Sequence, residues 1–289
     1  MTSETWTVRK VLEWTRGHFE KQAIDAPRLT AERLLGHVIQ RTRVQIYTEL
    51  DRPLHKDELA TYRALIQRRL AGEPTQYLMG ATEFYGRRFL VDARVLIPRP
   101  ETELLVEAVL RALPVDAPSR VLDLCTGSGC IAVSIAAERP QASVWAVDLM
   151  PNALEVARLN AEALGVGARV SFLHGDLFAP VPVDARFDVI VSNPPYVKTG
   201  ELPTLQREVR MEPRAALDGG DDGLTLIRRI ADHALKALKP GGLLALEIGE
   251  DQGQSVPELL VRAGCHEVRL EKDLERRDRL VFGRAPPKG

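Results

Sequence analysis

The chain has 289 residues, of which 45% are hydrophobic and 27% are charged. These proportions are typical of a globular protein and exclude extended intrinsic disorder. With 39 Lys and Arg against 40 Asp and Glu, the net charge of −1 gives no reason to expect a polyanionic partner. The three cysteines predict neither a disulfide framework nor a zinc knuckle, and no apolar run approaches the roughly 18 residues of a membrane span. We expect a cytoplasmic protein.

Residues 1–75 carry helical patterns only. Amphipathic stretches, two of them preceded by a proline, predict helices over residues 5–21, 29–40 and 56–71. No strand pattern precedes Tyr77. We therefore expect a small all-helical domain over residues 1–75.

Residues 76–98 read differently, because short aromatic and β-branched runs separated by glycines predict a β-hairpin linker. From residue 99 to 289 strands alternate with helices. The strands are expected over residues 120–124, 143–147, 169–173, 187–191 and 243–248, and the helices over 101–113, 129–139, 152–164 and 223–238. This alternation predicts an α/β domain with a doubly wound, mostly parallel sheet. Two strands around a charged turn, over residues 266–284, predict an antiparallel end.

The first motif that carries chemistry follows the strand over residues 120–124. It is the turn Cys125–Thr126–Gly127–Ser128–Gly129, which leads into a helix. Its glycines let a ligand approach the backbone, and the helix start offers free amide groups to an anion. Read as G-x-G-x-x-A, the same residues match the dinucleotide fingerprint. A tight turn without a ligand is the plain alternative.

Acidic residues follow the next two predicted strands. Asp148 lies 19 residues after Gly129 at a strand end, where a carboxylate accepts the hydroxyl groups of a ribose. Asp176 and Leu177 follow the third strand, where a carboxylate and an apolar group suit an adenine. A solvated loop aspartate is an equal alternative at position 176. Together the residues predict a nucleoside cofactor without saying which one.

The most informative motif is Ser192–Asn193–Pro194–Pro195–Tyr196, directly after the strand over residues 187–191. The two prolines fix the backbone, so a rigid loop is expected at the sheet edge where ligands bind. The Asn193 side-chain carbonyl, the Pro194 main-chain carbonyl and the Tyr196 ring offer two acceptors and an aromatic face. These groups suit a planar NH2 group conjugated to a π system, such as an amide or a nucleobase amine.

With these residues the chain resembles the class I S-adenosylmethionine-dependent methyltransferases that share an Asn-Pro-Pro-Tyr loop. The segments IPRPETE (residues 97–103) and EFYG (residues 83–86) narrow the resemblance to the PrmC/HemK family of peptide chain release factor N5-glutamine methyltransferases. The resemblance covers nearly the whole chain. It implies methyl transfer from S-adenosylmethionine to the side-chain amide nitrogen of the Gly-Gly-Gln glutamine in class 1 release factors.

The resemblance also implies the roles of individual residues. Cofactor contacts are expected from Cys125, Thr126, Gly127, Ser128, Gly129, Asp148, Asp176, Leu177 and Asn193. The substrate amide is expected to lie against Asn193, Pro194, Pro195 and Tyr196, with Asn193, Pro194 and Tyr196 catalytic. Two positions depart from the family, because Cys125 stands where glycine is common and Leu177 where an aromatic residue is common. No role follows for Arg99, Glu101 or Glu247.

The expected partners are release factors, met by a monomer that binds neither a membrane nor nucleic acid directly. The helical domain carries none of the nucleoside motifs, so we expect it to recognise the protein substrate. The six histidines are scattered without ligand spacing, and no metal is expected.

Two other functions are alternatives. A methyltransferase acting on amino groups of nucleic acid or ribosomal protein would share the Asn193–Tyr196 loop, but a nucleic-acid enzyme usually has a basic, aromatic groove. An NAD-dependent oxidoreductase would use Gly127 and Gly129, but it gives no account of the Asn-Pro-Pro-Tyr loop.

Overall fold

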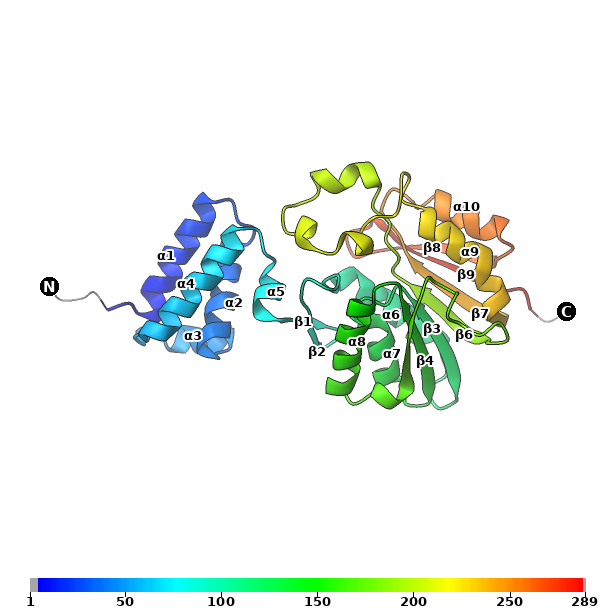
Figure 1. Cartoon of the computed structure of the whole chain (residues 1–289), viewed down its shortest axis with the longest axis horizontal. Coiled ribbons are helices and arrows are strands. Elements are labelled where there is room, and N and C mark those ends of the chain that lie inside the picture. Colours follow the sequence, from blue (N-terminus) through cyan, green and yellow to red (C-terminus); the bar gives the residue numbers. More distant parts are fainter. Residues whose placement is uncertain (1–4, 288–289) are drawn as a thin grey trace. The chain divides into compact units, whose positions relative to one another are not determined.

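Five helices build the first of two units in the computed structural model, which describes residues 5–287 (Figure 1). They are α1 (Val8–Lys21), α2 (Pro27–Ile39), α3 (Arg43–Thr48), α4 (Lys56–Leu70) and α5 (Thr75–Met79). The sequence patterns predict α1, α2 and α4. They do not predict α3 and α5, because helices of six and five residues are too short to show a hydrophobic period.

Local capping and a shared core explain why these helices form. The Thr7 side chain caps α1, and Thr42 forms a capping box with Gln45 at the start of α3. The apolar faces meet in one core whose members include Phe19 and Tyr62, and the Tyr62 hydroxyl donates to the carbonyl of Ala31 at 3.1 Å. Burial of these faces, more than helix propensity, holds helices of this length.

A short segment from much later in the chain belongs to this helical unit. Arg207–Met211 groups with the described part of Met1–Gly80. The buried Arg69 side chain pairs with Glu208, and the Arg207 guanidinium donates to the Leu70 carbonyl at 2.9 Å. No periodicity in the sequence predicts such a pairing between residues 139 positions apart.

The second unit begins with a β-hairpin. Strands β1 (Ala81–Phe84) and β2 (Arg87–Leu90) are joined by Tyr85 and Gly86, both with positive φ, which is the backbone of a tight two-residue turn. Phe84 and Phe89 are buried and meet edge to face, with ring centroids 5.8 Å apart. The hairpin therefore contributes its own apolar pair to the core of this unit.

A seven-stranded sheet forms the centre of the second unit. Its order is β5-β4-β3-β6-β7-β9-β8. The strands are β3 (Ser119–Leu124), β4 (Ala142–Asp148), β5 (Val170–His174), β6 (Phe187–Ser192), β7 (Leu238–Glu247), β8 (His266–Lys272) and β9 (Asp278–Arg284). The first five pair in parallel, and β9 runs antiparallel to both neighbours. The predicted doubly wound sheet with an antiparallel end is confirmed.

Helices cover both faces of the sheet (Figure 1). One face carries α6 (Pro100–Ala112), α7 (Cys130–Glu138) and α8 (Pro151–Ala163), and the other carries α9 (Thr225–Ala237) and α10 (Ser255–Arg262). From β3 the chain adds β4 and β5 toward one edge of the sheet. It then crosses back to form β6 on the opposite side of β3. Ligands in such sheets bind between two parallel neighbours whose connecting helices lie on opposite faces of the sheet. Here that place is beyond the carboxyl ends of β3 and β6.

None of the helices within residues 5–287 combines the length and the apolar character needed to span a membrane.

One buried amide connects three parts of the second unit. Asn160 on α8 accepts from the Leu90 nitrogen at 2.7 Å and donates to the carbonyls of Leu90 and Ser128 at 3.1 and 2.9 Å. It therefore joins α8 to the hairpin and to the turn after β3. The side chain is completely buried, so water cannot replace these bonds.

We expect Asn160→Ala to lower the free energy of unfolding by about 2–4 kcal/mol, because the Leu90 and Ser128 backbone groups lose their buried partner. Chemical denaturation followed by circular dichroism measures this change. Asn152→Ala, at an exposed asparagine of the same helix, is the matched control and should change stability by under about 0.5 kcal/mol. Equal stabilities for the two variants would contradict the role of Asn160.

Candidate functional site

The turn after β3 has a backbone that suits close approach of a ligand. Cys125, Gly127 and Gly129 all have positive φ, between 55° and 79°. A Cβ atom placed on Gly127 would have no described atom within 4 Å, whereas one on Gly129 would meet the Ala157 Cβ at 3.0 Å. Gly127 therefore faces open space, and Gly129 allows α7 to pack on α8. Cys125 also has this left-handed backbone, which glycine adopts more easily than other residues.

A buried aspartate within β3 holds this turn, and the sequence analysis missed it. Asp123 Oδ2 accepts from the Thr126 hydroxyl at 2.6 Å and from the Ala132 nitrogen at 3.2 Å. Burial raises the pKa of Asp123 to about 7. The sequence offered a signal, because Asp123 stands between Leu122 and Leu124 in a strand that is buried on both faces at this end.

Asp148, at the end of β4, lies beside the same turn. Its two carboxylate oxygens accept from the Gly127 and Met150 backbone nitrogens, each at 2.8 Å. Burial raises the pKa of Asp148, while these two amide bonds oppose the shift. Each oxygen keeps a further lone pair, so the carboxylate can still accept hydroxyl groups of a ligand.

The residues after β5 include Asp176 and Leu177, which were expected to contact an adenine. Leu177 is buried with a φ of 50°, and Asp176 pairs with Arg229 on α9 at 2.7 Å. Phe178 lies against the His233 ring, with centroids 5.9 Å apart. The aromatic side chain thus occupies a neighbouring depression, and Leu177 supplies the apolar surface on the side of Asp148.

The loop after β6 presents Asn193 to the site. The Asn193 amide nitrogen donates to the Thr102 hydroxyl at 3.2 Å, and that hydroxyl donates to Glu247 at 2.7 Å. The far side of the loop is braced by Gln252, whose amide donates to the Tyr196 carbonyl at 3.3 Å. Burial raises the pKa of the Tyr196 hydroxyl, so this group stays protonated.

One cavity at the carboxyl edge of the sheet collects most of the predicted residues. The predicted residues that line it are Cys125, Thr126, Gly127, Ser128, Asp148, Asp176, Leu177, Asn193 and Pro195. Gly129, Pro194 and Tyr196 lie outside its lining as the structure describes it. Arg99 and Thr102, from the IPRPETE segment, line it as well.

The IPRPETE segment is anchored by an acid that was not assigned a role from the sequence. Glu212 is buried and accepts from the Ile97 nitrogen at 3.0 Å and from the Arg99 guanidinium at 2.5 Å. Such a charge-assisted pair keeps Arg99 at the cavity wall. No sequence signal links residues 115 positions apart, although Glu212 stands directly before a proline.

Comparison with known proteins identifies the family. A model described as the PrmC N-terminal domain matches residues 10–80, and one described as the methyltransferase small domain matches residues 101–263. The release factor glutamine methyltransferase of Geobacter sulfurreducens is 46% identical over 282 residues, 97% of this chain and 98% of that protein. The chain belongs to the release factor glutamine methyltransferase family. The resemblance inferred from the motifs is confirmed.

Further relatives of this methyltransferase agree with that assignment. The release factor glutamine methyltransferase of Caulobacter vibrioides is 42% identical over 280 residues, 96% of both chains. Among solved structures, a methyltransferase from Pyrococcus furiosus gives a TM-score of 0.53 at 18% identity and covers 80% of this chain and 100% of that chain. The 16S rRNA methyltransferase RsmC of Thermus thermophilus gives 0.52 at 22% identity, covering 71% and 49%. These two likenesses concern the fold.

The cavity of this methyltransferase fits S-adenosylmethionine. Open space at the Gly127 Cβ position leaves room beside the backbone, and Asp148 offers carboxylate lone pairs for ribose hydroxyls. Leu177 gives an apolar wall for a purine ring.

We expect Asp148→Ala to weaken binding of S-adenosylmethionine by about 1.5–3 kcal/mol, because a charge-assisted contact and the brace on Gly127 are both lost. Isothermal titration calorimetry measures the affinity, and circular dichroism checks that the variant is folded. Asp188→Ala, at the start of β6, is the matched control and should keep the affinity. An unchanged affinity in folded Asp148→Ala would remove Asp148 from the cofactor site.

Proposed function

We propose that this methyltransferase transfers the methyl group of S-adenosylmethionine to the side-chain amide nitrogen of the Gly-Gly-Gln glutamine in class 1 release factors. The observation that carries the proposal is the setting of Asn193. It lines the same cavity as Gly127 and Asp148, and its amide nitrogen is turned toward Thr102. Asn193 Oδ1 is therefore the atom left to accept from a substrate NH2 group. Relatives named for this reaction, 42–46% identical over nearly their full length, support the substrate.

The chemistry requires a site that activates a weak nucleophile. An amide nitrogen reacts poorly because its lone pair is delocalised into the carbonyl group. S-adenosylmethionine, when bound, supplies an electrophilic methyl group. Asn193 Oδ1 and the Pro194 carbonyl accept the two N–H groups, orient the nitrogen and stabilise the positive charge that develops on it. The methylated nitrogen then loses its extra proton to water.

We assign the remaining site residues on the same basis. Cys125, Thr126, Gly127, Ser128, Gly129, Asp148, Asp176 and Leu177 contact the cofactor, together with Asn193. Asn193, Pro194, Pro195 and Tyr196 hold the glutamine side chain. Tyr196 packs against the core beside α9 and α10. We propose that its ring covers the planar amide of the substrate.

The helical unit is proposed to recognise the release factor as a folded protein. It carries no residue of the cofactor cavity, and it exposes large apolar side chains, among them Trp14 and Val44 at 52% and 74%. We propose further that the protein acts as a cytoplasmic monomer without direct contact to nucleic acid.

Asn193→Ala should cut methyl transfer by at least about two orders of magnitude, the scale for losing one preorganised polar group at a reacting centre. Binding of S-adenosylmethionine should stay within about threefold, because the ribose contacts lie elsewhere. Radiolabel transfer to a purified release factor measures the rate, and Asn152→Ala serves as the control. Near wild-type methylation of the glutamine by Asn193→Ala would make the loop structural.

The double variant Trp14→Ala, Val44→Ala should raise KM for the intact release factor at least about threefold, because exposed apolar anchors of an interface are removed. KM for a short Gly-Gly-Gln peptide should not change, since a peptide lacks the rest of the protein surface. Val115→Ala, an exposed apolar residue of the second unit, is the matched control. Equal KM increases for peptide and protein would contradict the proposed recognition role.

A further inference from the structure

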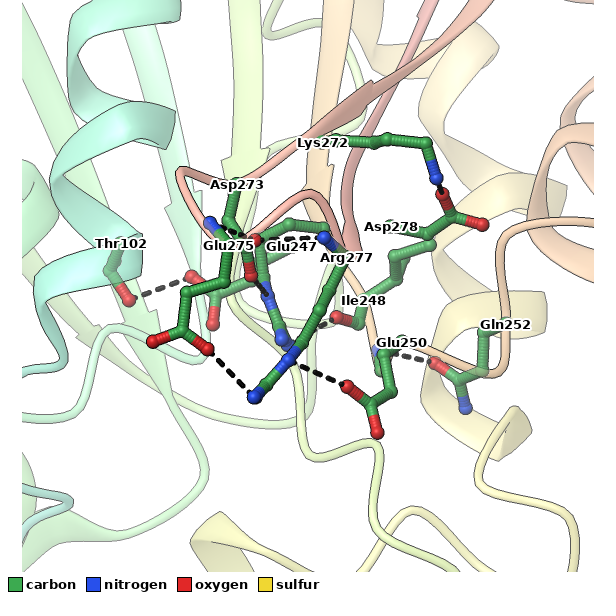
Figure 2. A network of polar contacts seen from close by, with 12 residues as sticks. Thr102, Glu247, Ile248, Glu250, Gln252, Lys272, Asp273, Glu275, Arg277 and Asp278 are labelled. Carbon is green, nitrogen blue, oxygen red and sulfur yellow. Dashed lines mark hydrogen bonds and ion pairs between the residues drawn. The ribbon is translucent and has the colours of Figure 1, made fainter.

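Asn193 is the first member of a chain of three hydrogen-bonded side chains. Its amide nitrogen donates to the Thr102 hydroxyl at 3.2 Å, and Thr102 donates to Glu247 Oε2 at 2.7 Å. The three residues come from the loop after β6, the first turn of α6 and the end of β7. Thr102 and Glu247 are each 1% exposed, so water does not compete for these bonds. Figure 2 shows the Thr102 hydroxyl directed at the Glu247 carboxylate.

We infer that Thr102 and Glu247 are positioning residues, which determine that Asn193 turns its carbonyl oxygen, and not its NH2 group, toward the substrate amide. This inference rests on the proposed function. A carboxylate can only accept hydrogen bonds, and a threonine hydroxyl has one proton. Thr102 therefore donates its proton to Glu247 and has only a lone pair left for Asn193. Asn193 can bond to that lone pair only by donating from its amide nitrogen.

The opposite orientation would defeat the reaction. An Asn193 side chain turned by 180° would present an NH2 group to the NH2 group of the glutamine, and two donors repel each other. The backbone constraint of Pro194 and Pro195 does not prevent this turn, because it fixes main-chain angles only. A side-chain contact must therefore decide whether the oxygen or the nitrogen of the Asn193 amide points at the substrate. Thr102 provides that contact.

Glu247 is itself surrounded by charged and titratable groups from several elements. Burial is the largest influence on its pKa and raises it, while the Thr102 hydrogen bond lowers it. Arg279 on β9 and Arg99 before α6 also lower the pKa, and Glu101 on α6 raises it. The negative charge of Glu247 in turn raises the pKa of Tyr196, in the loop after β6, and of Cys130 on α7. Glu247 is therefore a buried hydrogen-bond acceptor that feels the charges of two nearby arginines.

The turn between β8 and β9 holds Arg279 in place beside Glu247. Asp273 accepts from the Arg279 Nε at 3.3 Å, and the Arg279 Nη1 donates to the Ile248 carbonyl at 3.0 Å. Figure 2 shows Asp273 above Glu247, and Arg277 reaching outward to Glu250 and Glu275. The antiparallel end of the sheet thus supplies a cation that favours the ionised form of the buried carboxylate and opposes the effect of burial.

The direct test compares hydroxyl removal with hydroxyl retention at position 102. Thr102→Val keeps the shape of the side chain, and we expect it to lower kcat at least about tenfold with little change in KM for a Gly-Gly-Gln peptide. Thr102→Ser should recover most of that loss, because it restores the single proton and lone pair. Ser134→Ala removes a buried hydroxyl on α7 that has no hydrogen-bond partner within residues 5–287, and it is the matched control.

Calorimetric binding of S-adenosylmethionine and thermal unfolding separate this effect from damage to the fold. We expect the affinity of Thr102→Val to stay within about twofold of wild type. Equal kcat for Thr102→Val and Thr102→Ser would overturn the positioning role while leaving the proposed function intact. Failure of the wild-type protein to methylate the peptide or the release factor would overturn the proposed function first.

The pH dependence of kcat tests whether the charge of Glu247 affects the reaction. Burial raises the pKa of Glu247 to about 7. Below that pH the protonated acid can donate to Thr102, whose own proton is then free to point at Asn193. The Asn193 side chain then turns its Oδ1 toward Thr102 and its NH2 group toward the substrate, which removes the substrate acceptor. We expect kcat to fall as the pH decreases through about 7, and Glu247→Gln to lose this limb. An unchanged acid limb in Glu247→Gln would overturn the role of Glu247.

Discussion

The site depends on the parallel pairing of β3 with β6. Leu124 and Ser192, the last residues of these strands, lie opposite each other, and the Ser192 hydroxyl donates to the Leu124 carbonyl at 2.6 Å. The turn that begins at Cys125 and the loop that begins at Asn193 therefore leave the sheet from neighbouring positions. A cavity lined by Gly127 and Asp148 together with Asn193 follows from this register.

Buried carboxylates then give the loops at this edge their shape. Asp123 holds the glycine turn, Glu212 holds the segment that precedes α6, and Glu247 orients Asn193 through Thr102. Each is at most 5% exposed, and each accepts at least one hydrogen bond, which offsets part of the cost of leaving water. Burying three such acids costs free energy, and this cost rises if the hydrogen-bond donors move away. The donors therefore favour one arrangement of the loops.

Much of this arrangement was predictable because its causes are local. Apolar runs ending in Asp148 or before Asn193 mark strands and their carboxyl ends, and the topology of a doubly wound sheet brings those ends to one edge. The contacts that refine the site are not local. Thr102 and Glu247 are 145 positions apart, and Arg69 and Glu208 are 139 apart, so neither pairing leaves a periodic signal in the sequence. Leu177 has a left-handed φ, which its residue type does not predict.

The central claim is that this chain methylates a glutamine amide and no other group. The most direct measurement is to incubate the protein with isotopically labelled S-adenosylmethionine and a purified class 1 release factor, then to map the label by tandem mass spectrometry. The account predicts one labelled methyl group on the side-chain nitrogen of the Gly-Gly-Gln glutamine. Label on any other residue, or on nucleic acid offered in the same reaction, with that glutamine unmodified, would contradict it.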